Sequence, residues 1–330
     1  DWDLFELSDE EKLQGVRGVD SSLQNIKFIR QINSICFAPI FIFSKLGPDS
    51  IKQKLYEEGL YDDKKSNHIF IESKENIKQA RALFSKVKKW LVKTPSIYAM
   101  KEWERSMIHA KNSLFWDFYN ISPVWINILM QTYEYDGVDK NHELGTFLYK
   151  NLIARTNSCV FDEKIVNKKN KNITKNDLRK VLEHERFLVQ DKISANPATG
   201  DVFKIQNDQN GEYQYFINIR PDCDFIREAK KGVDVVLYCL RGRVVTEQKI
   251  NQKKWKGNFD EKINQTFIPF IDDGKIIEIL FKDIKTKKWN DIKDKRIGRL
   301  LPPYITRIQQ KYAFYLQRQG LPAIPFKAVK

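Results

Sequence analysis

The sequence predicts an α/β domain at the N-terminus, a helical segment in the middle, and a small β-rich domain closed by a helix. Over the first 93 residues, short apolar runs alternate with helical patterns, which is typical of parallel strands joined by helices. After residue 181, short apolar runs are instead separated by Gly, Asn and Asp, as in a small barrel or curled sheet.

The first domain, residues 1–93, contains two apolar runs that read as buried strands, Pro39–Ser44 and His68–Glu72. Helical patterns precede, separate and follow them, at Ser21–Ile32, between Pro48 and Gly59, and at Asn76–Val92. Two strands do not make a stable parallel sheet. We therefore expect further strands in this domain, with its N-terminal part missing from the sequence.

Residues 94–160 are predicted to be helical and are dense in aromatic side chains. Their helical spacing favours packing in a core over stacking on bases. Residues 161–180 are basic and polar and are predicted to be a linker or exposed loop. Residues 181–330 form the β-rich domain, and its last helix is expected from Tyr304 to Gln319, after Pro302-Pro303.

Composition excludes several classes of protein. Hydrophobic residues make up 42% of the 330, so global disorder is excluded, and 14 Gly with 11 Pro exclude a collagen-like chain. The longest apolar run is too short to cross a bilayer, so no membrane partner is expected. The four cysteines make no CxxC pair, and we expect buried thiols in a reducing cytoplasm.

Charge is distributed unevenly along the chain. The net charge is +14, yet residues 1–75 carry a net charge of −4. From Lys295 to Lys330 there are eight basic residues and no acidic one. In the last helix, Arg307, Lys311 and Arg318 are predicted to point away from the apolar face. This basic surface is expected to meet an acidic partner, either nucleic acid or an acidic protein, and the lack of interleaved aromatic residues favours a protein.

Three polar residues fall at the predicted carboxyl ends of strands. Asp1 lies where a further strand would end, Ser44 ends the next strand, and Lys74 follows the last one. A site that accepts a phosphoryl group needs a carboxylate as acceptor, acids that hold Mg²⁺, and a hydroxyl and a lysine to neutralise the phosphoryl oxygens.

This order of Asp, Ser and Lys resembles the second half of a response-regulator receiver domain, over about 92 residues. The resemblance implies a flavodoxin-like fold with Asp1 as phosphoacceptor and Mg²⁺ ligand, Ser44 as the switch hydroxyl, and Lys74 as the lysine that contacts the phosphoryl group. An active receiver with Mg²⁺ and a degenerate one without a cofactor, kept as a protein-binding module, both remain open.

Two later segments, Tyr215–Asp224 and Gly298–Tyr304, resemble parts of receiver-fused proteins in bacterial anti-phage conflict systems. Such proteins are similar to partners of histidine-kinase-like ATPases. The resemblance implies a non-enzymatic regulatory or scaffold protein in a signalling or defence pathway.

A competing interpretation is a metal-dependent nuclease of the PD-(D/E)xK type. Pro48-Asp49 followed by Glu72-x-Lys74 matches that short pattern. In such a site Asp49 and Glu72 would hold Mg²⁺, and Lys74 would orient the attacking water. The hypothesis requires the two carboxylates to lie together, whereas the sequence places Asp49 at a helix start.

Overall fold

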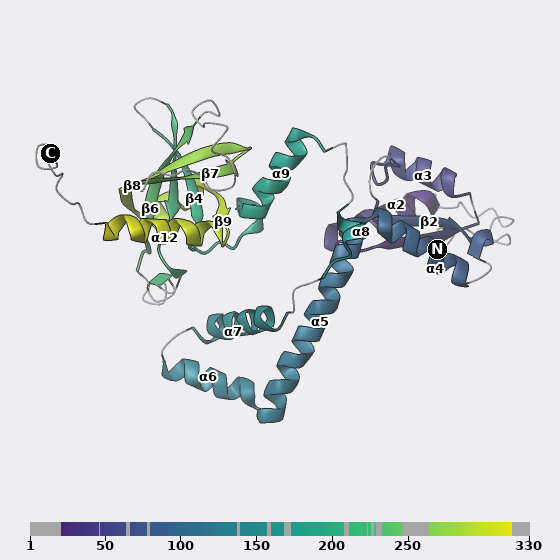
Figure 1. Ribbon diagram of the computed structural model, residues 1–330, viewed down its shortest axis with the longest axis horizontal. Coiled ribbons are helices and arrows are strands. Elements are labelled where there is room, and N and C mark those ends of the chain that lie inside the picture. The colour runs from purple at the N-terminus through teal and green to yellow at the C-terminus, as the bar shows by residue number, and fades with distance from the viewer. Residues whose placement is uncertain are drawn as a thin grey trace, which may run out of the picture. The chain divides into compact units, whose positions relative to one another are not determined.

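The computed structural model describes residues 21–45, 47–63, 67–77, 80–136, 139–156, 160–167, 173–207, 211–222, 224–225, 228, 233–245 and 264–318. The chain divides into two compact units (Figure 1). The N-terminal unit comprises residues 1–135 and 140–169, and the C-terminal unit comprises residues 136–139 and 170–330.

The N-terminal unit begins with a layered α/β part and continues into helices (Figure 1). Its elements are α2 (Ser21–Ile35), β1 (Ile40–Ser44), α3 (Pro48–Glu57), β2 (Ile69–Ser73), a 3-10 turn (Lys74–Ile77), α4 (Ala80–Lys93), α5 (Pro95–Ile121), α6 (Trp125–Tyr135), α7 (Lys140–Arg155) and α8 (Glu163–Val166). β1 and β2 pair in parallel, from Ile40 opposite Ile69 to Ser44 opposite Ser73. Within the described residues these two strands are the whole sheet of this unit, so the expected additional strands stay a prediction.

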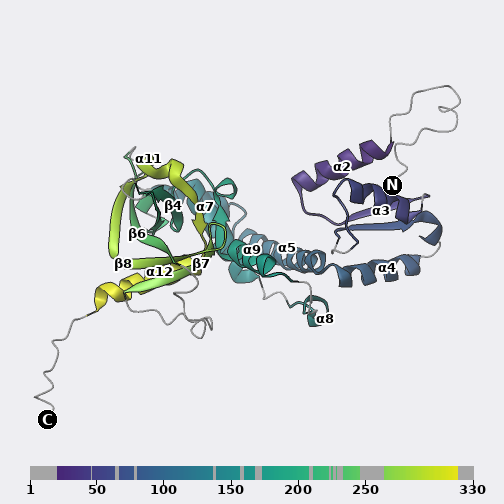
Figure 2. The same cartoon turned by 90° about the horizontal axis from the view of Figure 1, so that it is seen from above.

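Side chains of β1 and β2 point alternately to the two faces of the sheet, and helices cover both faces. Ile42 and Ile69 belong to a core cluster with buried residues of α2 and α3, among them Ile51. On the other face, Phe41 and Phe70 contact Trp90 of α4, with ring centroids 5.6 and 5.7 Å apart. Figure 2 shows α2 and α3 on one side of the strands and α4 on the other. Both strand faces are thus covered, as expected for parallel strands.

The helical segment packs α5 against α6 and α7. Phe118 of α5, Trp125 of α6 and Phe147 of α7 form an aromatic cluster, and Trp125 is 6% exposed. The prediction that the aromatic residues here are core residues is wrong for Trp116 and Tyr119, which are 63% and 52% exposed. Helical spacing marks one face of a helix, but it does not say whether another element covers that face.

Over its described residues, the C-terminal unit contains a curled antiparallel sheet of seven strands in the order β3-β9-β4-β5-β6-β8-β7. The strands are β3 (Phe187–Val189), β4 (Asp201–Gln206), β5 (Tyr213–Asn218), β6 (Val236–Val245), β7 (Gln265–Ile271), β8 (Lys275–Lys288) and β9 (Arg296–Leu300). The helices are α9 (Lys175–Arg186), α11 (Trp289–Ile292) and α12 (Tyr304–Gln317), with 3-10 turns at Gln190–Lys192 and Lys293–Lys295. Ile305 and Ile308 of α12 are buried in the main core between the strands.

Residues 161–180, predicted as a linker or loop, contain α8 and the first half of α9. Thr174 and Asp177 form a capping box at the start of α9, with the Thr174 side chain accepting from the Asp177 amide at 3.0 Å. Such a box satisfies amides that the first helical turn leaves free. Among the described residues, no helix combines the length and apolar character that a membrane span requires.

Candidate functional site

The parallel register brings two of the predicted site residues to the same edge of the sheet. Ser44 and Ser73 are opposite each other at the carboxyl ends of β1 and β2. Ser44 is fully buried, and Ser73 is 8% exposed. Lys74 follows Ser73 directly, in the 3-10 turn. The hydroxyl and the lysine of the predicted phosphoryl site therefore end adjacent strands, and the third residue, Asp1, lies outside the described residues.

Glu72 belongs to the face of the sheet that α4 covers. Its carboxylate pairs with the Lys86 ammonium of α4 at 2.7 Å and accepts from the Asn76 amide at 2.9 Å and the Ser73 backbone amide at 3.1 Å. Burial alone would raise the pKa of Glu72, but the hydrogen bonds from Lys86, Asn76 and Ser73 outweigh it and lower that pKa. Glu72 thus acts as a structural tie between β2 and α4.

Asp49 lies in the first turn of α3, where its charge complements the helix dipole. Its side chain is 96% exposed and pairs with Lys52 at 3.1 Å. Beside it is a hollow of about 380 Å³ lined by Asp49, Lys52, Gln53, Tyr56, Asp62 and Asp63. Glu72 is not among the described lining residues, and each of the two carboxylates contacts a different lysine. The described part of the chain also holds no group of three or more His, Cys, Asp or Glu placed to bind a metal ion.

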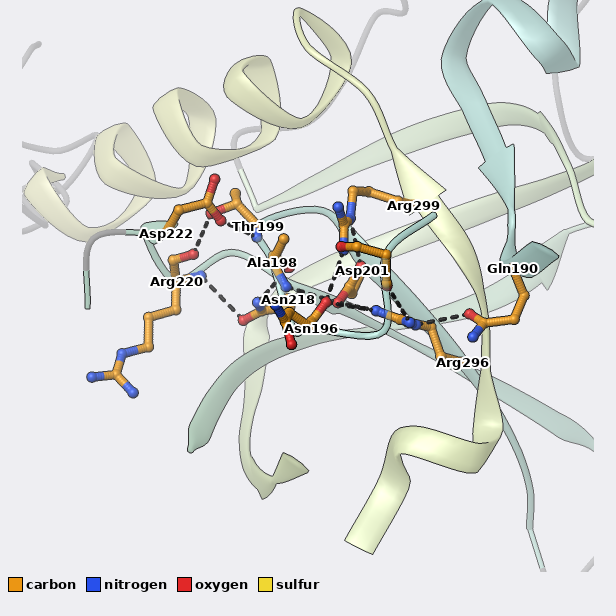
Figure 3. Close-up of polar contacts among 11 residues, drawn as sticks. Gln190, Asn196, Ala198, Thr199, Asp201, Asn218, Arg220, Asp222, Arg296 and Arg299 are labelled. Carbon is orange, nitrogen blue, oxygen red and sulfur yellow. Dashed lines mark hydrogen bonds and ion pairs between the residues drawn. The ribbon is translucent and has the colours of Figure 1, made fainter. Parts of the chain in front are cut away.

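The C-terminal unit contains a buried polar cluster that the sequence did not predict (Figure 3). Asp201, at the start of β4, is fully buried and accepts from Arg299 at 2.7 Å and Arg296 at 3.1 Å. Arg296 also donates to Gln190 at 2.8 Å and to the carbonyl oxygens of residues 194 and 196 at 2.8 and 3.0 Å. Each of the three guanidinium nitrogens of Arg296 donates to a protein acceptor, so the cluster holds the loop before β4 onto β9 and is structural.

Figure 3 also shows the polar contacts of the segment that follows β5. The Asp222 carboxylate accepts from the Thr199 amide at 2.6 Å, and the Thr199 hydroxyl donates to the Arg220 carbonyl at 2.5 Å. Arg220 forms an ion pair with Glu228 at 2.5 Å and a longer one with Asp224 at 3.5 Å. The Asp222 carboxylate therefore caps the loop at Thr199 and has a structural role.

The three predicted basic residues of α12 differ in their surroundings. Arg307 and Arg318 are exposed, and the Arg318 guanidinium lies 4.2 Å from the ring centroid of Tyr315. Lys311 is half-buried, and burial lowers the pKa of its ammonium group. Phe314 is exposed beside them, so at least one aromatic ring does interleave the cations, contrary to the prediction.

Compared with models of known protein families and with curated proteins, the chain has no match.

Proposed function

We propose that the chain is a non-enzymatic regulatory or scaffold protein whose N-terminal unit is a receiver-like domain. It acts with a histidine-kinase-like ATPase in a bacterial signalling or defence system. The observation that supports this proposal is the register of β1 and β2. It places Ser44 opposite Ser73, and Lys74 directly follows Ser73 in the chain. A receiver needs a hydroxyl and a lysine at the ends of two adjacent parallel strands, with helices on both faces of the sheet.

The phosphoryl site would use Asp1 as acceptor and Mg²⁺ ligand, Ser44 as the hydroxyl that senses the phosphoryl group, and Lys74 as its counter-charge. When bound, Mg²⁺ would neutralise part of the charge on the phosphoryl oxygens. Asp1 lies outside the described residues, so the proposal rests on the Ser44 and Lys74 edge.

Beryllofluoride with Mg²⁺, a mimic of the phosphorylated carboxylate, tests this proposal. In an active receiver the mixture raises the unfolding temperature of the N-terminal unit, and Asp1→Asn abolishes the rise. Asp49→Asn is the matched control, because Asp49 is an exposed carboxylate of the same unit. No response in the intact protein selects the degenerate version, in which the domain binds its partner without phosphorylation.

The nuclease interpretation receives less support. Glu72 is held on the α4 face by Lys86, while Asp49 is solvent-exposed on α3, a helix that packs on the other face. A two-carboxylate metal site would require Glu72 to leave its three hydrogen-bond partners. Hydrolysis of DNA with Mg²⁺ that is lost in both Asp49→Asn and Glu72→Gln would reverse this preference.

We further propose that α12 presents a basic surface to an acidic partner. The helix is docked through Ile305 and Ile308, which fixes Arg307 and Arg318 on the outside. A fixed set of cations attracts a polyanion without the ordering cost that a free tail would have.

A further inference from the structure

One face of α5 carries an exposed stripe whose spacing is that of a coiled coil. The seven exposed side chains of this stripe are Lys101, Arg105, Ile108, Asn112, Phe115, Trp116 and Tyr119. Apart from Trp116, which broadens the stripe, successive members are separated by alternating steps of four and three residues. This is the heptad spacing that keeps one helix face against a partner helix.

Most of the stripe lies away from the face of α5 that the unit already uses, and its Phe115 borders that face, since it contacts Trp125 of α6 with ring centroids 5.7 Å apart. Ala110 and Leu114 are buried, and Phe118 contacts Phe147 of α7 with ring centroids 5.2 Å apart. At 100° per residue these three positions point away from the stripe. The stripe itself includes Ile108, 55% exposed, and Trp116, 63% exposed. Large apolar side chains exposed on one face of a helix are typical of an interaction site.

The stripe is asymmetric along the helix. Its N-terminal part is cationic, with Lys101 and Arg105, and its C-terminal part is aromatic, with Phe115, Trp116 and Tyr119. A parallel pair of copies would place lysine against lysine and arginine against arginine, which is repulsive. An antiparallel pair places each cation against a ring, which is attractive.

We propose that α5 pairs antiparallel with α5 of a second copy of this chain, about a two-fold axis level with Ala110. In this register Arg105 faces Phe115 of the second copy, Lys101 faces Tyr119, and Ile108 faces Asn112. The interface is isologous, since every contact occurs twice, so it closes as a dimer. It spans about 27 Å of helix, at 1.5 Å per residue.

Two features beside the axis fit this register. The two Asn112 side chains fall in adjacent layers, where a polar residue at a seam position fixes alignment. Next to Asn112 the surface has a hollow of about 290 Å³ lined by Asn112, Phe115, Trp116, Tyr119 and Trp125. Ile108 of the second copy lies level with this hollow and supplies the knob for it.

Sedimentation velocity of the full chain from about 1 to 100 μM tests the pairing, since that range brackets a micromolar dissociation constant. We expect a concentration-dependent dimer. Trp116→Gln should weaken it about tenfold or more, because Trp116 is the most exposed aromatic ring of the stripe and a buried aromatic anchor typically contributes that much. Trp103→Gln should not, because Trp103 is 54% exposed on the same helix but lies off the stripe. A chain that stays monomeric over the whole range overturns the proposal, as does a dimer that Trp116→Gln leaves unchanged.

Cross-linking tests the direction of the pair. Arg105→Cys and Phe115→Cys chains are mixed and oxidised, and the linked peptides are identified by mass spectrometry, which separates them from links through native cysteines. Disulfides between position 105 of one chain and position 115 of the other support the antiparallel register. Links between two copies of position 105 overturn it. Because both positions are exposed, circular dichroism should show unchanged folding for each variant.

Discussion

Ser44 and Ser73 are partners in the parallel register, each the last residue of its strand. They differ in what the receiver proposal asks of them. Ser44 would sense the phosphoryl group, whereas the Ser73 hydroxyl accepts from the Glu75 amide at 3.3 Å and shapes the turn. We therefore predict that Ser44→Ala diminishes the beryllofluoride-dependent rise in unfolding temperature, and that Ser73→Ala lowers stability but preserves the rise. A rise that is equal in Ser44→Ala and the wild type would contradict the assigned role of Ser44.

Asp272 gives the C-terminal unit a predictable loss of stability in acid. Its carboxylate accepts from the Tyr215 hydroxyl at 2.5 Å and pairs with Lys275 at 2.7 Å and Lys204 at 2.9 Å. Burial alone would raise the pKa of Asp272, but these three partners lower it to about 2 from 3.8. A carboxyl whose folded pKa is depressed stabilises the fold above its unfolded pKa, and this contribution is lost as the pH falls from about 4 to about 2.

The matched variant is Asp272→Asn, because Asp272 has a φ of 50° and asparagine also tolerates the left-handed region. The lowered pKa corresponds to about 2 kcal/mol at neutral pH. We expect urea unfolding at pH 7 to show a loss of that order, and the loss to shrink at pH 3. An equal loss at both pH values would show that the charge of Asp272 is not the cause.

Asp201 should be far more costly to replace than an exposed aspartate. Its side chain is fully buried, as is that of Arg296, which is 2% exposed. Asp201→Ala leaves a buried guanidinium without its counter-charge, which typically costs about 3 kcal/mol or more. Asp191→Ala is the control, because Asp191 is 70% exposed and its ion pair with Lys192 contributes about 0–1 kcal/mol. Amide hydrogen exchange of β4 and β9 should accelerate strongly in the first variant and little in the second.

The sequence predicted the elements whose patterns are local and missed those that depend on long-range contacts. β1 and β2 lie within one residue of their predicted bounds, because continuous apolar runs mark strands buried on both faces. β9 was missed: its sequence RIGRL mixes a buried arginine, Arg296, and a partly buried one, Arg299, with apolar residues, and only the distant Asp201 makes burial of Arg296 favourable. The Asp201 cluster left no signal in the sequence for the same reason.

Gly298 shows why β9 also needs a residue without a side chain. A Cβ atom there would collide with the Leu188 carbonyl oxygen and the Phe187 ring, because the neighbouring strand β3 packs closely against β9 at this point. We expect Gly298→Ala to lower the unfolding temperature. Gly145→Ala in α7 is the opposite case, since nothing lies within 4 Å of the added Cβ atom. This substitution should raise the free energy of unfolding by about 0.5–1 kcal/mol, because alanine favours a helix over glycine. Equal effects of the two substitutions would contradict this close packing of β3 against Gly298.

The basic surface of α12 predicts a specific dependence of binding on salt. For a protein bound to duplex DNA, log K falls linearly with log salt, with a slope of about −0.9 for each phosphate contact. Replacing Arg307, Lys311 and Arg318 together with Gln should make the slope shallower by about 2 to 3, since each lost cation removes up to one contact. Folding should persist, because Ile305 and Ile308 still dock the helix on the sheet.

The matched control removes the same charge from the N-terminal unit, by changing three exposed cations of α4 to Gln: Lys88, Lys89 and Lys93. If the two triple variants lose affinity equally, net charge alone drives the binding and α12 has no special role. If wild-type protein binds neither DNA nor RNA at about 50 mM salt, where phosphate contacts are strongest, the partner of α12 is not a nucleic acid. The remaining candidate partner is then a protein with an acidic surface. For such a partner, the triple α12 variant should lower the association rate constant and leave the dissociation rate constant nearly unchanged, because cations at the rim of an interface chiefly steer the encounter.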